Sequence, residues 1–171
     1  AMSRLEEYRD WAPKLDANNR WWQLYVEAKQ YMAERLDELG FVTPIYHSGP
    51  LDLAFELRGT DLYFDLADKP EEVRGFLQFL TDFTLDVADK QRSIPGKAFD
   101  DDVWAPGWGF NVCIPGNGGN TTVDVSCQLG TEMFESVEAP FLKTITTHSP
   151  EYLLHTHAVG KHQFEAYCRI P

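Results

Sequence analysis

The sequence predicts an α/β protein in which a few parallel strands alternate with helices. Three segments are strand candidates, at residues 41–47, 121–127 and 152–157, and helical patterns stand between them. Strands that are separated by helices imply a parallel sheet, because the chain must cross back before the next strand can run in the same direction. Three strands are too few to close a barrel, so we expect both edges of this sheet to be open.

Composition allows a packed domain and excludes several kinds of partner. The chain has 171 residues, of which 43% are hydrophobic and 13% aromatic, enough for a sizeable core. Its net charge of −12 argues against nucleic acid and against an anionic membrane surface as partners. No run approaches the roughly 20 apolar residues of a spanning helix. Three widely spaced cysteines form no disulfide framework, so we expect a reduced, cytoplasmic setting.

The first part of the chain is a helical lead-in over about residues 1–40, within a single domain of residues 1–171. Residues 2–16 predict a short helix that is broken near Pro13. Residues 21–39 repeat apolar side chains with a period near 3.6, which predicts a longer helix. Asn19 can cap the start of that helix, and Gly40 follows its last periodic residue.

The alternating part occupies about residues 41–171. Residues 41–47 predict a strand, and residues 51–58 a short helix that Gly59 ends. The pattern at residues 61–68 fits either a helix or a strand. Residues 70–92 form a long amphipathic pattern, with Pro at the first helical position and two acids after it.

The second half begins with a change in amino-acid composition. Residues 93–120 are rich in Gly, Pro and Asn and predict a long loop. Residues 121–127 alternate like a strand, and a helix begins at Thr131 and pauses near Pro140. Residues 152–157 predict a third strand, and residues 163–169 a final helix.

Two histidines two residues apart end the third predicted strand. In a strand, His155 and His157 point to the same face, and the carboxyl end of a strand is where α/β folds place their chemistry. Imidazole is a common zinc ligand, and a catalytic zinc ion needs about three protein ligands with one open position. His162 or His47 could approach the same edge. The alternative is that these histidines bind an organic substrate or backbone groups.

Other side chains are candidates for substrate contact, each with a plainer alternative. Asp124, inside the second predicted strand, is a candidate general acid or base, or else an exposed or paired acid. Asp52 lies in the first turn of a helix, where a carboxylate favours the helix dipole, and it can bind substrate or simply cap the helix. Cys127 ends the same strand as Asp124 and is either a rim thiol or a small buried residue. Trp104 and Trp108 can cover a ligand or simply pin the long loop.

Several segments share order and spacing with a known family. They are WWQLYVE (21–27), GPLD (49–52), LRGT (57–60), LADKPEEV (66–73), GTEMFE (130–135), APF (139–141) and LHTHAVG (154–160). Together they resemble the uroporphyrinogen decarboxylase-like superfamily, which includes cobamide-dependent methyltransferases. The resemblance implies a (β/α)8 TIM barrel with its site at the carboxyl rim, of which this chain would hold roughly the middle half.

The same resemblance implies two enzyme activities. The decarboxylases remove carboxyl groups from a tetrapyrrole without a cofactor, but their arginine-rich first strand has no counterpart here. The methyltransferases move a methyl group from a corrinoid to a thiol held by zinc, using a His-x-Cys pair and a later cysteine. His155 matches their histidine, whereas His157 stands where the cysteine would be. A third possibility is a non-catalytic half-barrel that pairs with another copy or a complementary chain through its open sheet edges.

Overall fold

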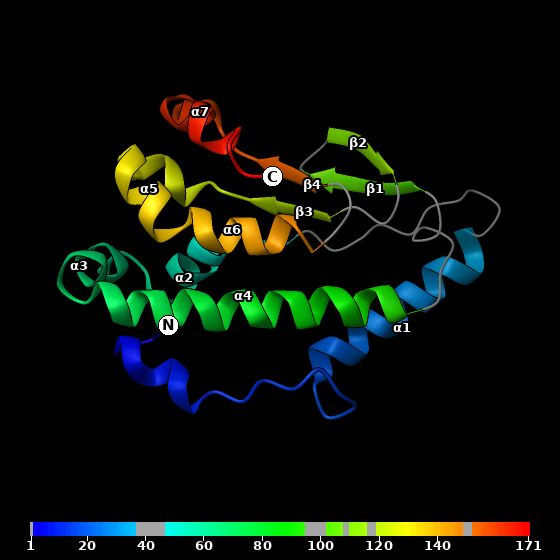
Figure 1. Cartoon of the computed structure of the whole chain (residues 1–171). Coiled ribbons are helices and arrows are strands. Elements are labelled where there is room, and N and C mark those ends of the chain that lie inside the picture. The colour runs from blue at the N-terminus through cyan, green and yellow to red at the C-terminus, as the bar shows by residue number, and fades with distance from the viewer. Residues whose placement is uncertain (1, 37–46, 95–101, 108–109, 116–118, 149–151) are drawn as a thin grey trace.

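Helices make up most of the part of the chain that the computed structural model describes, which is residues 2–36, 47–94, 102–107, 110–115, 119–148 and 152–171 (Figure 1). The elements in chain order are η1 (Leu5–Asp10), α1 (Arg20–Leu36), α2 (Pro50–Arg58), α3 (Asp61–Asp68), α4 (Pro70–Ser93), β1 (Asp102–Gly107), β2 (Phe110–Pro115), β3 (Gly119–Thr122), η3 (Val125–Gln128), α5 (Thr131–Val137), α6 (Ala139–Thr146), β4 (Tyr152–His155), η4 (Ala158–Gln163) and α7 (Phe164–Tyr167).

The described strands form two small two-stranded sheets. β3 and β4 run parallel, with Gly119 opposite Tyr152 and Thr122 opposite His155. His47 adds an isolated parallel bridge to Thr121, beside β3. β1 and β2 form a separate antiparallel hairpin. The carboxyl ends of β3 and β4 therefore meet at one edge, as parallel pairing requires.

The expectation of a partial TIM barrel, with strands alternating with helices, is wrong for the described residues. Helices α2, α3 and α4 follow one another with no strand between them, and the only described parallel ladder joins the four-residue strands β3 and β4. Barrel closure needs a continuous series of tilted, paired strands, which two such short strands cannot supply. The strand predicted at residues 41–47 lies outside the described residues except for His47.

The predicted long loop is also wrong in part, because residues 102–115 contain the β1–β2 hairpin. Its signal was present in the alternation of Phe110, Val112 and Ile114. Pro106 within the first strand obscured it, since proline is tolerated in strands mainly at edges. A two-stranded ribbon offers such an edge.

Local chemistry explains where the predicted helices begin and end. Asn19 Oδ1 accepts hydrogen bonds from the backbone N–H groups of Trp21 and Trp22, so it caps α1 as expected. Helix α2 begins at Pro50 and ends before Gly59, whose positive φ of 71° suits a residue without a Cβ atom. The ambiguous segment 61–68 is the helix α3.

Helix α4 is the long amphipathic helix that the sequence predicts, and it organises the core. Its buried side chains include Val73, Phe76 and Leu77, which belong to one cluster with Leu51 of α2 and Leu142 of α6. Figure 1 shows α4 running between the N-terminal segment and the β3–β4 sheet. Burial of this apolar stripe, rather than intrinsic helix propensity, supplies most of the stability of such a helix.

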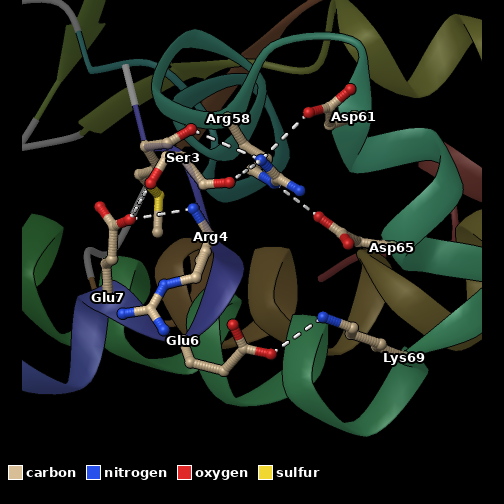
Figure 2. A network of polar contacts seen from close by, with 9 residues as sticks. Ser3, Arg4, Glu6, Glu7, Arg58, Asp61, Asp65 and Lys69 are labelled. Carbon is tan, nitrogen blue, oxygen red and sulfur yellow. Dashed lines mark hydrogen bonds and ion pairs between the residues drawn. The ribbon is translucent and has the colours of Figure 1, made fainter.

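The N-terminal segment is held by aromatic and ionic contacts. The ring of Tyr8 lies 5.2 Å from that of Phe76, centroid to centroid. At the other end of the segment, Arg58 donates from Nε to Asp65 at 2.6 Å and from Nη1 to the carbonyl of Ser3 at 3.0 Å (Figure 2). Arg58 therefore ties the N-terminus to α2 and α3.

No helix among the described residues combines the length and the apolar composition that crossing a membrane demands.

Candidate functional site

A cluster of two imidazoles and one carboxylate stands at the carboxyl ends of β3 and β4. His155 is the last residue of β4, His157 follows two residues later, and Asp124 follows β3. The backbone N–H of Val123 donates to the carbonyl of His155 at 2.9 Å, which brings the two strand ends together. One possible donor atom from each of the three side chains lies within 4.8 Å of the other two.

The two histidine rings lie side by side, as the sequence pattern predicts. Their centroids are 5.2 Å apart and their planes are nearly perpendicular. The strand itself ends at His155, so the prediction of a strand through residue 157 is two residues too long. His157 nevertheless keeps extended backbone angles, φ −86° and ψ 156°. The alternation of side chains therefore continues past the last ladder hydrogen bond.

Asp124 belongs to the cluster, but not as a strand residue. The predicted strand 121–127 ends at Thr122, and Asp124 has the helical angles φ −71° and ψ −41° just before η3. Its Oδ1 atom is buried and lies 3.6 Å from Nε2 of His157. That separation is longer than a hydrogen bond. In a second His–Asp pair, outside the cluster, Nε2 of His148 lies 2.8 Å from Oδ1 of Asp89.

The turn that carries Asp124 is held by Asp52. Its carboxylate, from the first turn of α2, accepts the backbone N–H of Val125 at 2.7 Å and that of Asp124 at 3.2 Å. It also accepts the hydroxyl of Thr122. These bonds satisfy the N–H groups of the turn into η3, where the ladder with β4 has ended. Asp52 is 5% exposed and joins α2 to this turn; it does not cap its own helix.

Glu138 is a second buried acid that the sequence analysis missed. It lies between α5 and α6 with no exposed surface, and within the described residues neither of its carboxyl oxygens has a hydrogen-bond partner. Burial raises its pKa well above the usual 4.5, and the charge of Asp52 raises it further. A signal was available, because Glu138 stands four residues after the apolar Phe134 and four before the apolar Leu142.

Asp52 and Glu138 are neighbouring acids with different environments. Burial raises the pKa of Asp52 too, but the bonds from Thr122, Val125 and Asp124 oppose that rise. Hydrogen bonds donated to a carboxylate favour its ionised form. Glu138 receives none from the described residues. The pKa of both acids is therefore raised, but only at Asp52 do hydrogen bonds oppose the effect of burial.

Cys127 lies close to the cluster, but its surroundings favour the protonated thiol over the reactive thiolate. The expected strand end is wrong for this residue, because it lies in η3 and is half-buried. Burial raises the pKa of its thiol, and the charges of Asp124 and Asp52 raise it further. A reactive thiolate needs the opposite environment. Its Cβ would lie 3.3 Å from a Cβ atom added at Gly160, so the side chain packs beneath the segment after His157.

The remaining predicted site residues lie apart from the cluster or outside the described residues. His162 Nε2 is 3.0 Å from the carbonyl of Leu129, and His162 is not one of the three grouped donors. His47 Nε2 is 2.9 Å from Oε1 of Gln91, near the end of α4. Trp104 lies on β1, opposite Cys113, instead of in a loop. Trp108 lies outside the described residues.

The donor atoms of the cluster are of kinds that zinc binds. Zinc binds His nitrogens and Asp oxygens at about 2.0–2.2 Å, so two tetrahedral ligands are separated by roughly 3.4 Å. The 3.6 Å between His157 Nε2 and Asp124 Oδ1 is close to that value. His157 is 63% exposed at its side chain, so the cluster opens toward solvent on one side. Three protein ligands and one open position are typical of catalytic zinc.

Comparisons with protein-family models, curated proteins and solved structures give no match. The resemblance to the uroporphyrinogen decarboxylase-like superfamily therefore stands on the sequence segments alone.

Proposed function

We propose that the chain binds one zinc ion through His155, His157 and Asp124, and that the ion activates a small thiol for nucleophilic attack. The carrying observation is the convergence of two imidazoles and a carboxylate within 4.8 Å at one strand edge. The enzyme class suggested by the sequence resemblance, methyl transfer from a corrinoid to a thiol, uses this chemistry.

The charge of the ligand set supports an anionic fourth ligand. Two neutral imidazoles and one carboxylate leave a zinc site with a net charge of about +1, which favours a thiolate over a neutral thiol. A zinc ion held there would lower the pKa of a bound thiol and so supply a nucleophilic sulfur at neutral pH. His157, being exposed, lies on the side from which a thiol can enter.

The test is zinc content of protein purified without chelator, by elemental analysis. We expect about one zinc per chain in the wild type and none in the His155→Ala, His157→Ala double variant, since two of three ligands are removed. His148→Ala is the matched control, because it removes a histidine that also faces an aspartate but has no third donor in the described groups. It should keep its zinc.

Wild-type protein that is metal-free and also fails to bind added zinc by calorimetry would overturn the proposal. The thiol is tested on cobalt-substituted protein, whose visible absorption reports the ligand set. Addition of a small thiol should change that spectrum by adding sulfur coordination, and an unchanged spectrum would remove the thiol from the proposal while leaving the metal site.

A further inference from the structure

We propose that Asp52 is a positioning residue that holds the ligand Asp124 in place for the metal, an inference that rests on the proposed zinc site. The two residues are 72 positions apart in the sequence, and Asp52 accepts the backbone N–H of Asp124 at 3.2 Å. Asp52 itself offers no atom to the three-donor cluster.

The contacts of Asp52 determine where the turn carrying Asp124 can lie. Its two oxygens accept three hydrogen bonds from the turn, donated by the hydroxyl of Thr122, the N–H of Asp124 and the N–H of Val125. A carboxylate is an acceptor at both oxygens, which suits a site that offers donors alone. An amide has one acceptor oxygen and would present an N–H₂ group to at least one of these donors.

The hydrogen bonds of the Asp52 carboxylate go to the β3–η3 turn and not to a cap of its own helix. Helix α2 has Gly49 at its N-cap, and no side chain caps it there. The carboxylate is 5% exposed and directed across to the β3–η3 turn.

The experiment compares zinc affinity in Asp52→Asn and Asp65→Asn, measured by competition with a chromophoric chelator. Asp65 is a matched control, because it is also a buried, hydrogen-bonded acid but pairs with Arg58 at the C-terminal end of α2. Loss of groups that orient metal ligands costs about 10- to 100-fold in metal affinity. We expect that loss in Asp52→Asn and wild-type zinc affinity in Asp65→Asn, although both variants should be less stable.

Two further measurements separate positioning from general stability. The visible spectrum of cobalt-loaded Asp52→Asn should differ from that of the wild type, because Asp124 is no longer held at the metal. Thr122→Val removes one donor to Asp52 and should weaken zinc binding, whereas Thr122→Ser keeps the hydroxyl and should restore it. The Thr122 pair also tests the inference if Asp52→Asn does not fold.

The failures of the two proposals are distinguishable. Wild-type protein that binds no zinc overturns the metal site, and the role of Asp52 falls with it. Wild-type protein whose zinc is lost in His157→Ala, together with unchanged affinity and an unchanged cobalt spectrum in Asp52→Asn, overturns this inference alone. Equal losses of affinity in Asp52→Asn and Asp65→Asn would also overturn it, by showing that affinity follows overall stability.

Discussion

Glu138 is a buried acid whose ionisation is unfavourable in the folded protein. Its carboxyl group is fully buried, with no hydrogen-bond partner within the described part of the chain. Ionising such a group in an apolar interior is unfavourable, so the folded protein keeps the proton that the unfolded chain releases above its pKa. At the residue scale this makes Glu138 a source of pH-dependent stability.

Glu138→Gln should flatten the dependence of stability on pH. Because the folded-state pKa of Glu138 is raised above 4.5, the folded protein holds more protons than the unfolded chain above that pH. Wild-type stability should therefore fall as pH rises above about 5. Glutamine does not titrate, so the Glu138→Gln variant should be more stable than the wild type at the higher pH values. Thermal unfolding across this range measures the effect.

The control for this prediction is Glu132→Gln, which changes an exposed acid of α5. Its unfolding should keep the wild-type pH dependence. An equal slope in wild type and Glu138→Gln would show that Glu138 is ionised in the folded protein.

At the scale of elements, the site depends on how closely α2 approaches β3. Gly49, the N-cap of α2, lies against Thr122, and a Cβ atom added at Gly49 would sit 2.2 Å from the Thr122 carbonyl oxygen. The Gly49 N–H also donates to the Thr122 hydroxyl at 3.3 Å. The absence of a side chain at Gly49 is therefore what allows Asp52, three residues later, to reach the β3–η3 turn.

Gly49→Ala should destabilise the protein by about 1–3 kcal/mol, the usual cost of forcing extra atoms into a closed contact. Gly130→Ala is the matched control, because Gly130 is also the N-cap of a helix but has nothing within 4 Å of an added Cβ atom. Both variants lose a glycine N-cap, so the difference between them in urea unfolding isolates the contact with Thr122. Equal stabilities would mean that α2 can shift away at no cost.

Element boundaries also show where sequence patterns succeed. Helices α2 and α4 begin at Pro50 and Pro70 and end close to the predicted residues, because caps and prolines act within one turn. The strand predicted at 121–127 ends at Thr122 instead, and Asp52, far away in sequence, accepts the N–H groups of the turn that follows. The β1–β2 hairpin was missed because Pro106 and two glycines resemble loop chemistry.

At the scale of the molecule, a metal at the cluster would link two segments. Asp124 follows β3, His155 ends β4 and His157 follows it, so an ion bound to all three would hold the strand ends together. The network around Arg58 does the same for the N-terminus, α2 and α3 without a metal (Figure 2).

Zinc should therefore raise the unfolding temperature of the whole chain. At free zinc 100 times the dissociation constant, a ligand of the folded state adds about 2.7 kcal/mol, which for a chain of this size corresponds to roughly 5–10 °C. Differential scanning calorimetry with and without zinc measures the shift. His148→Ala should show the wild-type shift, and the His155→Ala, His157→Ala variant should show none. A shift of equal size in that double variant would place the stabilising metal elsewhere.

The sequence by itself determined the features that depend on near neighbours. The cap at Asn19, the stop at Gly59, the amphipathic face of α4 and the shared side of His155 and His157 all follow from contacts within a few residues. Tertiary structure alone decided that Asp124 joins the histidines, that Asp52 holds its turn and that β3 ends at Thr122. These outcomes depend on burial and on hydrogen bonds between segments about 70 residues apart, which no local pattern records.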